Sequence, residues 1–200
     1  WSLDWLTMCP VTGRKWDLRD NNVQKKVVDM IRKDKPELLI LCPPCTFFSA
    51  LQNLAGDPRI RCPDKWKEAV GMVNFAVELS MLQKTSGRKF LFEHPLGATS
   101  WTRTKLKELS KESGVVEAKT HMCVFGMEAT DSSGTAPVMK PTRFLTNSTA
   151  IQEMLQKSCW RDHRHVHLVN GRAAAAAEYP IPLVDAVLDG IQMEKVAKEM

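Results

Sequence analysis

The chain has 200 residues, 44% of them hydrophobic, and a formal net charge of +5. This size and composition suit one globular domain with a buried core, and no apolar stretch approaches the roughly 18 residues of a membrane span. The charge permits a nucleic-acid partner without requiring one. The six cysteines lie in apolar and strand-end contexts and favour a reducing, intracellular compartment, nuclear or cytoplasmic.

Hydrophobic periodicity predicts helices that alternate with strands along the chain. The expected strands cover residues 1–4, 38–41, 89–92, 115–118, 122–125 and 141–145. The expected helices cover residues 22–33, 63–84, 97–113, 149–156 and 182–198, with turn-rich or polar loops at 53–64, 131–135, 161–167 and 171–177. This alternation predicts an α/β fold, and the buried apolar strands favour a mostly parallel sheet flanked by helices.

Two strand tips carry the residues most suited to chemistry. The apolar strand at 38–41 stops at Pro43 and Pro44, and Cys45 follows at once. The strand at 89–92 ends in Glu93 and His94. Ligands in open parallel sheets bind beyond the carboxyl ends of the strands, so a thiol and a carboxyl group are expected at one edge of the sheet.

The order of these motifs resembles the cytosine-C5 DNA methyltransferases. In that family a Pro-Pro-Cys loop followed by Phe-Ser carries the nucleophile, and a Glu-Asn-Val tripeptide on the next strand carries the acid. Here Pro43-Pro44-Cys45 with Phe48-Ser49 and then Glu93-His94-Pro95 stand in that order. Weaker matches are Ser2-Leu3-Asp4, Trp16-Asp17-Leu18, Pro141-Thr142-Arg143 and the segment from Gly171-Arg172-Ala173 to Pro182.

The resemblance implies a Rossmann-like methyltransferase fold and a transferase that uses S-adenosylmethionine for DNA methylation. It implies DNA binding with base flipping, because the target base must leave the stack to be modified; RNA or a nucleotide are the other substrates considered. The implied catalytic residues are Cys45 as nucleophile, Glu93 as base-binding acid and Arg143 as active-site support. The implied cofactor contacts are Asp4, Asp17 and Pro43, and the implied substrate contacts are Pro44, Ser49, His94 and Thr142. For His94 a structural hydrogen bond to the Pro-Pro-Cys loop is the alternative.

The sequence departs from the family at two places. The first cofactor motif, Phe-x-Gly-x-Gly, is missing, and we expect residues 1–200 to be one domain truncated at its N-terminus. Only about 27 residues separate Arg143 from Gly171, fewer than the roughly 50 of an independent recognition domain. A partner or flanking domain would have to supply the missing parts.

Other interpretations of the same residues stay open. The domain could be a non-catalytic methyltransferase-like module that binds nucleic acid or docks a partner. Cys42 and Cys45 also form a Cys-x-x-Cys pair typical of thiol-disulfide oxidoreductases. The basic run at 103–111 is by default a solvated helix face. Cys159, His163, His165 and His167 offer zinc ligands, but a closing ligand such as Cys123 would have to come from elsewhere, so we expect a polar loop and no metal.

Overall fold

The computed structural model describes residues 3, 8, 13–49, 52, 56–169 and 176–199. The expected strand at 1–4 and most of the turn at 171–177 lie outside the described residues, except Leu3, Ala176 and Ala177. The elements, in chain order, are α1 (Asn21–Asp34), β1 (Leu38–Leu41), η1 (Thr46–Phe48), α2 (Pro58–Arg61), α3 (Pro63–Thr85), β2 (Lys89–Pro95), η3 (Thr99–Thr102), α4 (Thr104–Leu109), β3 (Val116–His121), η4 (Met122–Phe125), β4 (Glu128–Asp131), β5 (Gly134–Pro137), β6 (Pro141–Thr146), α5 (Thr149–Leu155) and α7 (Ile181–Glu199).

The central sheet has the strand order β1-β2-β6-β3. Strands β1 and β2 pair in parallel, whereas β6 pairs antiparallel with both of its neighbours, β2 and β3. The α/β class is therefore confirmed, but the described sheet is mostly antiparallel and not mostly parallel as expected. The reason is the place of β6: three of the four strands point the same way, and the reversed strand lies between two of them.

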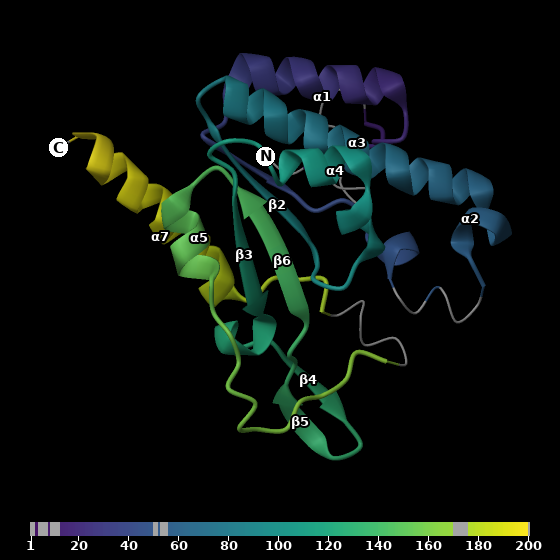
Figure 1. Ribbon diagram of the computed structural model, residues 1–200, viewed down its shortest axis with the longest axis vertical. Coiled ribbons are helices and arrows are strands. Elements are labelled where there is room, and N and C mark those ends of the chain that lie inside the picture. The colour runs from purple at the N-terminus through teal and green to yellow at the C-terminus, as the bar shows by residue number, and fades with distance from the viewer. Residues whose placement is uncertain are drawn as a thin grey trace.

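Helices cover both faces of this sheet (Figure 1). On one face, α1, α3 and α4 pack apolar side chains against β1 and β2, including Ile31, Val73 and Leu106. On the other face, α5 and α7 form a second core around β3 and β6. The β4–β5 hairpin projects beyond the sheet, at the bottom of Figure 1. The result is a three-layer arrangement in which β2 and β6 contribute buried residues to both cores.

The segment from β1 to β2 has the predicted order of strand, loop and long helix, except that the loop expected at 53–64 contains the short helix α2. Pro43 and Pro44 end β1, because proline lacks the N–H that a strand ladder needs. Pro63 begins α3, where its missing N–H costs nothing. Helix α3 then crosses back over the sheet, and the parallel register places Leu41 opposite Phe92. The chain therefore leaves β1 and passes Glu93 of β2 at the same edge of the sheet.

Two other local predictions differ from the structure. Residues 122–125 form the 3-10 helix η4 and not a strand, because the chain turns there and Gly126 ends the turn with a φ of 81°. Residues 97–113 divide into η3 and α4 and do not form one helix. The turn-rich loop expected at 131–135 is confirmed as the tight turn of the β4–β5 hairpin, but the two strands of the hairpin were not predicted. Its four-residue strands are too short to show a periodic pattern.

Within the described part of the chain, no helix combines the length and apolar character needed to cross a membrane.

Candidate active site at the ends of β1 and β2

The Pro-Pro-Cys loop carries Cys45 out of β1 into a short helical turn. Cys45 has helical backbone angles and sits at the N-terminal cap of η1. Phe48, in the same turn, is fully buried and packs against Trp66, with 5.1 Å between ring centroids. Burial of Phe48 thus anchors the loop, and the thiol of Cys45 remains half-buried at the strand end.

His94 ties the loop to β2. Its Nε2 lies 2.9 Å from the Pro43 carbonyl oxygen, and its Nδ1 lies 2.6 Å from Ser100 Oγ. A carbonyl oxygen only accepts, so Nε2 carries the proton and Nδ1 accepts from the serine hydroxyl. Burial lowers the pKa of His94 to about 4, so the ring is neutral at physiological pH. The structural alternative for His94, a hydrogen bond to the loop, is confirmed.

Glu93 points to the opposite face of β2 from His94 and is buried, with 8% of its surface exposed. Tyr179 hydrogen-bonds to its carboxylate, and the positive charge of Lys140 acts on it. Burial is the larger influence and raises the pKa of Glu93. The side chain is therefore a carboxyl group that retains a proton more readily than an exposed glutamate.

Cys42, the first residue after β1, completes a chain of polar contacts. Its sulfur lies 3.1 Å from the Tyr179 hydroxyl oxygen. Either the thiol or the phenol can donate in this contact. Cys42 is exposed toward the cavity described below, but protein atoms also pack around its sulfur; this packing, with the charge of Glu93, raises the pKa of Cys42 to about 12.

The charge of Glu93 also reaches Cys45. The pKa of the Cys45 thiol is raised first by burial and then by the negative charge of Glu93, whereas Lys140 acts weakly in the other direction. Two anions are unfavourable together in such a site. A negative charge on both Cys45 and Glu93 is therefore unfavourable.

Arg143 does not join these residues. It lies opposite His94 in the antiparallel pairing of β6 with β2, and opposed residues share a face of the sheet. Arg143 forms an ion pair with Glu117 and stacks over Trp101, 4.3 Å from the ring centroid. The expected support of Glu93 by Arg143 is thus replaced in the structure by Lys140.

Thr142 is also turned away from the site. Its side chain is fully buried, and its Oγ1 donates to the Lys140 carbonyl oxygen at 3.0 Å. This bond stabilises the backbone at Lys140, which has a φ of 28°. The structure therefore places Thr142 as a support for the strand start, where it makes no direct approach to Cys45 among the contacts described.

A cavity of about 960 Å³ runs along β1, within the size range of small-molecule sites. Pro43 and Pro44 line it, together with Cys42 and Tyr179 from the cluster around Glu93. Asp17 also lines the cavity. Both of its carboxylate oxygens accept from Arg19 at 2.8 Å, and this bonding lowers the pKa of Asp17.

The remaining predicted residues have less defined places. Ser49 caps the C-terminal end of η1, where its backbone N–H donates to Thr46. Asp4 and the closing segment at 171–173 lie outside the described residues. In the basic run, Lys105 bonds to Glu78 at 2.7 Å and Arg103 lies over Trp66, so part of this run serves α4 packing.

Sequence reasoning missed two members of the site, Lys140 and Tyr179. Lys140 immediately precedes the predicted motif at 141–143, and Tyr179 lies inside the segment compared with the family's closing motif. The one local signal for Tyr179 is that it forms a Tyr-Pro pair directly before the last predicted helix. A residue at the start of a helix has a fixed position. Lys140 Nζ donates to the Ala176 carbonyl oxygen at 2.7 Å and lies 5.9 Å from the Tyr179 ring centroid.

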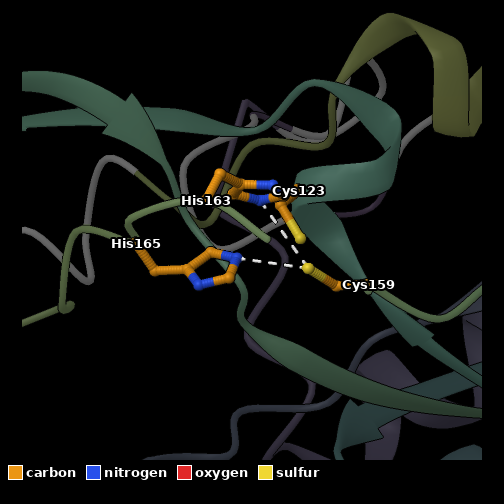
Figure 2. Close-up of side chains that lie close together, drawn as sticks. All are labelled: Cys123, Cys159, His163 and His165. Carbon is orange, nitrogen blue, oxygen red and sulfur yellow. Dashed lines mark hydrogen bonds between the residues drawn. The ribbon is translucent and has the colours of Figure 1, made fainter. Parts of the chain in front are cut away.

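A second group of chemically capable side chains lies near η4 (Figure 2). Cys123, Cys159, His163 and His165 turn their ligand atoms toward one another, and all four atoms lie within 4.8 Å of each other. Cys123, the ligand that the 159–167 segment lacked, comes from η4. These four residues could hold a metal ion; His167, considered with them in the sequence, is not in the described group.

Comparison with protein-family models, with curated proteins and with solved structures finds no match to this chain. Function must therefore be argued from the site itself.

Proposed function

We propose that the protein transfers a methyl group from S-adenosylmethionine to C5 of cytosine in DNA through a covalent bond to Cys45. The observation that carries this proposal is the placement of Cys45 and Glu93 toward the same ends of the parallel strands β1 and β2, near enough for the charge of Glu93 to act on the thiol. A nucleophile beside a proton-holding carboxyl group is what addition to a cytosine ring requires. The α/β class agrees with what the motifs imply, whereas the antiparallel strand β6 departs from the mostly parallel sheet that they imply.

The closeness of Glu93 to Cys45 suggests how the thiol becomes reactive. Movement of one proton from Cys45 to Glu93 yields the thiolate and the acid together, at no change in net charge. The thiolate adds to C6 of cytosine while Glu93 donates to N3. C5, now enamine-like, would accept the methyl group that bound S-adenosylmethionine supplies. A water molecule would then take the C5 proton, the electron pair left behind would expel Cys45 as thiolate, and the N3 proton would return to Glu93.

The cavity along β1 fits the cofactor in volume and in its mostly apolar walls. S-adenosylmethionine would supply an electrophilic methyl group there. Pro43 would support it beside the strand end, and Asp17 would offer acceptor oxygens, since a carboxylate that binds one arginine retains free lone pairs. Lys140 and Tyr179 would hold the charge and orientation of Glu93.

DNA is the proposed substrate because the pocket must admit a single base that has left its stack, at a cost of a few kcal/mol. Phosphate contacts are the usual source of compensating affinity. Lys107 and Lys111 are exposed on and just after α4, and they are the members of the basic run best placed to contribute. A partner or flanking domain would extend this surface.

Two alternatives make different predictions. A Cys-x-x-Cys oxidoreductase needs an attacking thiol of lowered pKa, whereas burial raises the pKa of both Cys42 and Cys45. This opposes the redox function. The same raised pKa values, and the bonding of Asp17 to Arg19, favour a non-catalytic module as the second candidate, which would bind DNA without transferring a methyl group.

The decisive assay follows labelled methyl groups from S-adenosylmethionine into cytosine-containing duplex DNA. Wild type should label DNA, Cys45→Ala should not, and Glu93→Gln should be slower by about 100-fold or more, as for loss of an acid–base group. Cys42→Ser is the matched control, because a serine hydroxyl can also donate to Tyr179, and it should keep most of the activity.

Calorimetric binding of S-adenosylmethionine separates the two candidates. Binding without transfer would favour a module that has lost catalysis. Transfer by Cys45→Ala at the wild-type rate would reject the proposed nucleophile.

A further inference from the structure

The strongest additional feature of the molecule is the cluster of Cys123, Cys159, His163 and His165. The two cysteine sulfurs and two imidazole nitrogens turn toward one another from two segments (Figure 2). Cys123 belongs to η4. The other three belong to the stretch after α5, in which residues 156–169 contain no described helix or strand.

From this geometry we propose that Cys123, Cys159, His163 and His165 bind one structural zinc ion. The set has four ligands, two sulfur and two nitrogen, which is a closed tetrahedral composition typical of structural zinc. Carboxylates, which would favour calcium or magnesium, are not among the four.

The distances fit this coordination. In a tetrahedral site with Zn–S near 2.3 Å and Zn–N near 2.0 Å, a sulfur and a nitrogen ligand lie about 3.5 Å apart. Cys159 Sγ lies 3.6 Å from His163 Nε2 and 3.4 Å from His165 Nε2. Both histidines therefore present the nitrogen that faces the sulfur, at the separation that a shared ion would impose.

Outer contacts prepare two of the ligands. His163 Nδ1 lies 2.8 Å from the Asp162 carboxylate, which can only accept, so Nδ1 carries the proton and Nε2 offers its lone pair. A histidine oriented by a carboxylate is a common arrangement in zinc sites. The backbone N–H of Arg161 donates to Cys159 Sγ at 3.2 Å, and Arg161 has a φ of 61°. This turn directs a backbone donor at the sulfur.

A cation would hold the two thiols together. The ligand atoms of Cys123 and Cys159 lie within 4.8 Å of each other. A dication between the sulfurs would bind both as thiolates, since metal binding deprotonates a coordinating thiol. The ion would join η4 to the 156–169 segment, which is otherwise held by contacts such as Val166 N–H to the Pro137 carbonyl at 2.9 Å.

The test measures zinc in the purified 200-residue chain by mass spectrometry of the metal, and then titrates metal-free chain with Co²⁺. We expect close to one zinc per chain and a visible tetrahedral Co²⁺ spectrum with sulfur charge transfer. Cys159→Ser and His165→Ala should lose both signals. Asp162→Asn should keep the spectrum but weaken affinity by about 10- to 100-fold, as for other groups that orient a ligand.

Matched controls are His167→Ala, a histidine two residues from the site, and Cys62→Ser, a half-buried cysteine outside the cluster. Both should retain zinc and the cobalt spectrum. The proposal is overturned if the wild-type chain binds neither metal, if His167→Ala loses zinc as His165→Ala does, or if Cys123 and Cys159 form a disulfide in place of a metal site. Each readout is independent of methyl transfer, so the proposal stands or falls separately from the proposed function.

Discussion

At the residue scale, the site depends on how Glu93 is charged. Burial raises its pKa, while Lys140 and Tyr179 oppose this rise. Motif order placed Cys45 and Glu93 toward the ends of neighbouring strands, and the structure has Cys45 in the turn after β1 and Glu93 near the end of β2. Motif order could not predict Lys140 as the nearby cation, since Arg143 is the residue that the motif names. Whether Lys140 or Arg143 lies near Glu93 depends on the alternation of side chains along β6. That alternation follows the strand register, which the sequence does not show.

The pH dependence of stability tests this environment of Glu93. A carboxyl group whose folded pKa exceeds its unfolded value, ordinarily near 4.5, binds more protons in the folded state, so stability falls as pH rises between the two values. The contribution is fully present below about pH 4.5 and is lost as pH rises through the folded pKa. Urea unfolding of Glu93→Gln should therefore show a gain in stability over wild type that grows from acid to neutral pH.

Glu128→Gln is the matched control, since Glu128 is an exposed carboxyl group in β4, and its difference from wild type should not grow with pH. His94 is present in both proteins compared, so its own titration cancels. A gain for Glu93→Gln that is the same at acid and neutral pH would show that the site does not raise the pKa of Glu93.

At the element scale, capping residues and hydrophobic periodicity in the sequence were sufficient to predict the long helices and strands. Asp20 caps α1 by accepting from the Asn22 N–H at 2.7 Å, and β1 has the predicted bounds. The short elements were not predictable in this way. Residues 122–125 are apolar enough for a strand, but the turn at Gly126 and the burial of Met122 and Phe125 favour a 3-10 helix. Tertiary packing thus overrides local propensity there.

One residue, Gly190, controls how closely α5 and α7 pack together. A Cβ placed on Gly190 would lie 2.8 Å from Ile151 Cα and 2.9 Å from Ile151 N, both backbone atoms. Gly190→Ala should therefore force the helices apart and lower the free energy of unfolding by about 1–3 kcal/mol.

Gly71→Ala provides the control, because Gly71 lies within α3 and a Cβ there would meet nothing within 4 Å. It should be neutral or stabilising by up to about 1 kcal/mol, from helix propensity alone. Denaturant titration measures both variants. Equal effects of the two substitutions would mean that α5 and α7 do not approach as closely as described.

At the scale of the whole molecule, the sheet brings together parts of the chain that the sequence separates. Parallel pairing of β1 with β2 joins the thiol segment to Glu93, and α7 contributes Tyr179 from just before its first turn. The sequence predicted the α/β class from its alternation of elements. It did not predict that β6 lies between β2 and β3, since strand order depends on long-range packing and not on local pattern.

The most direct test of the central claim uses duplex DNA that contains 5-fluorocytosine, together with S-adenosylmethionine. Fluorine at C5 cannot leave as a cation, so elimination stops and the bond from Cys45 to C6 persists. Intact-mass spectrometry should find a protein–DNA adduct with wild type and with Cys42→Ser, mapped to Cys45, and none with Cys45→Ala. An adduct that persists in Cys45→Ala, or wild-type protein that binds S-adenosylmethionine and DNA but forms none, would contradict covalent catalysis by Cys45.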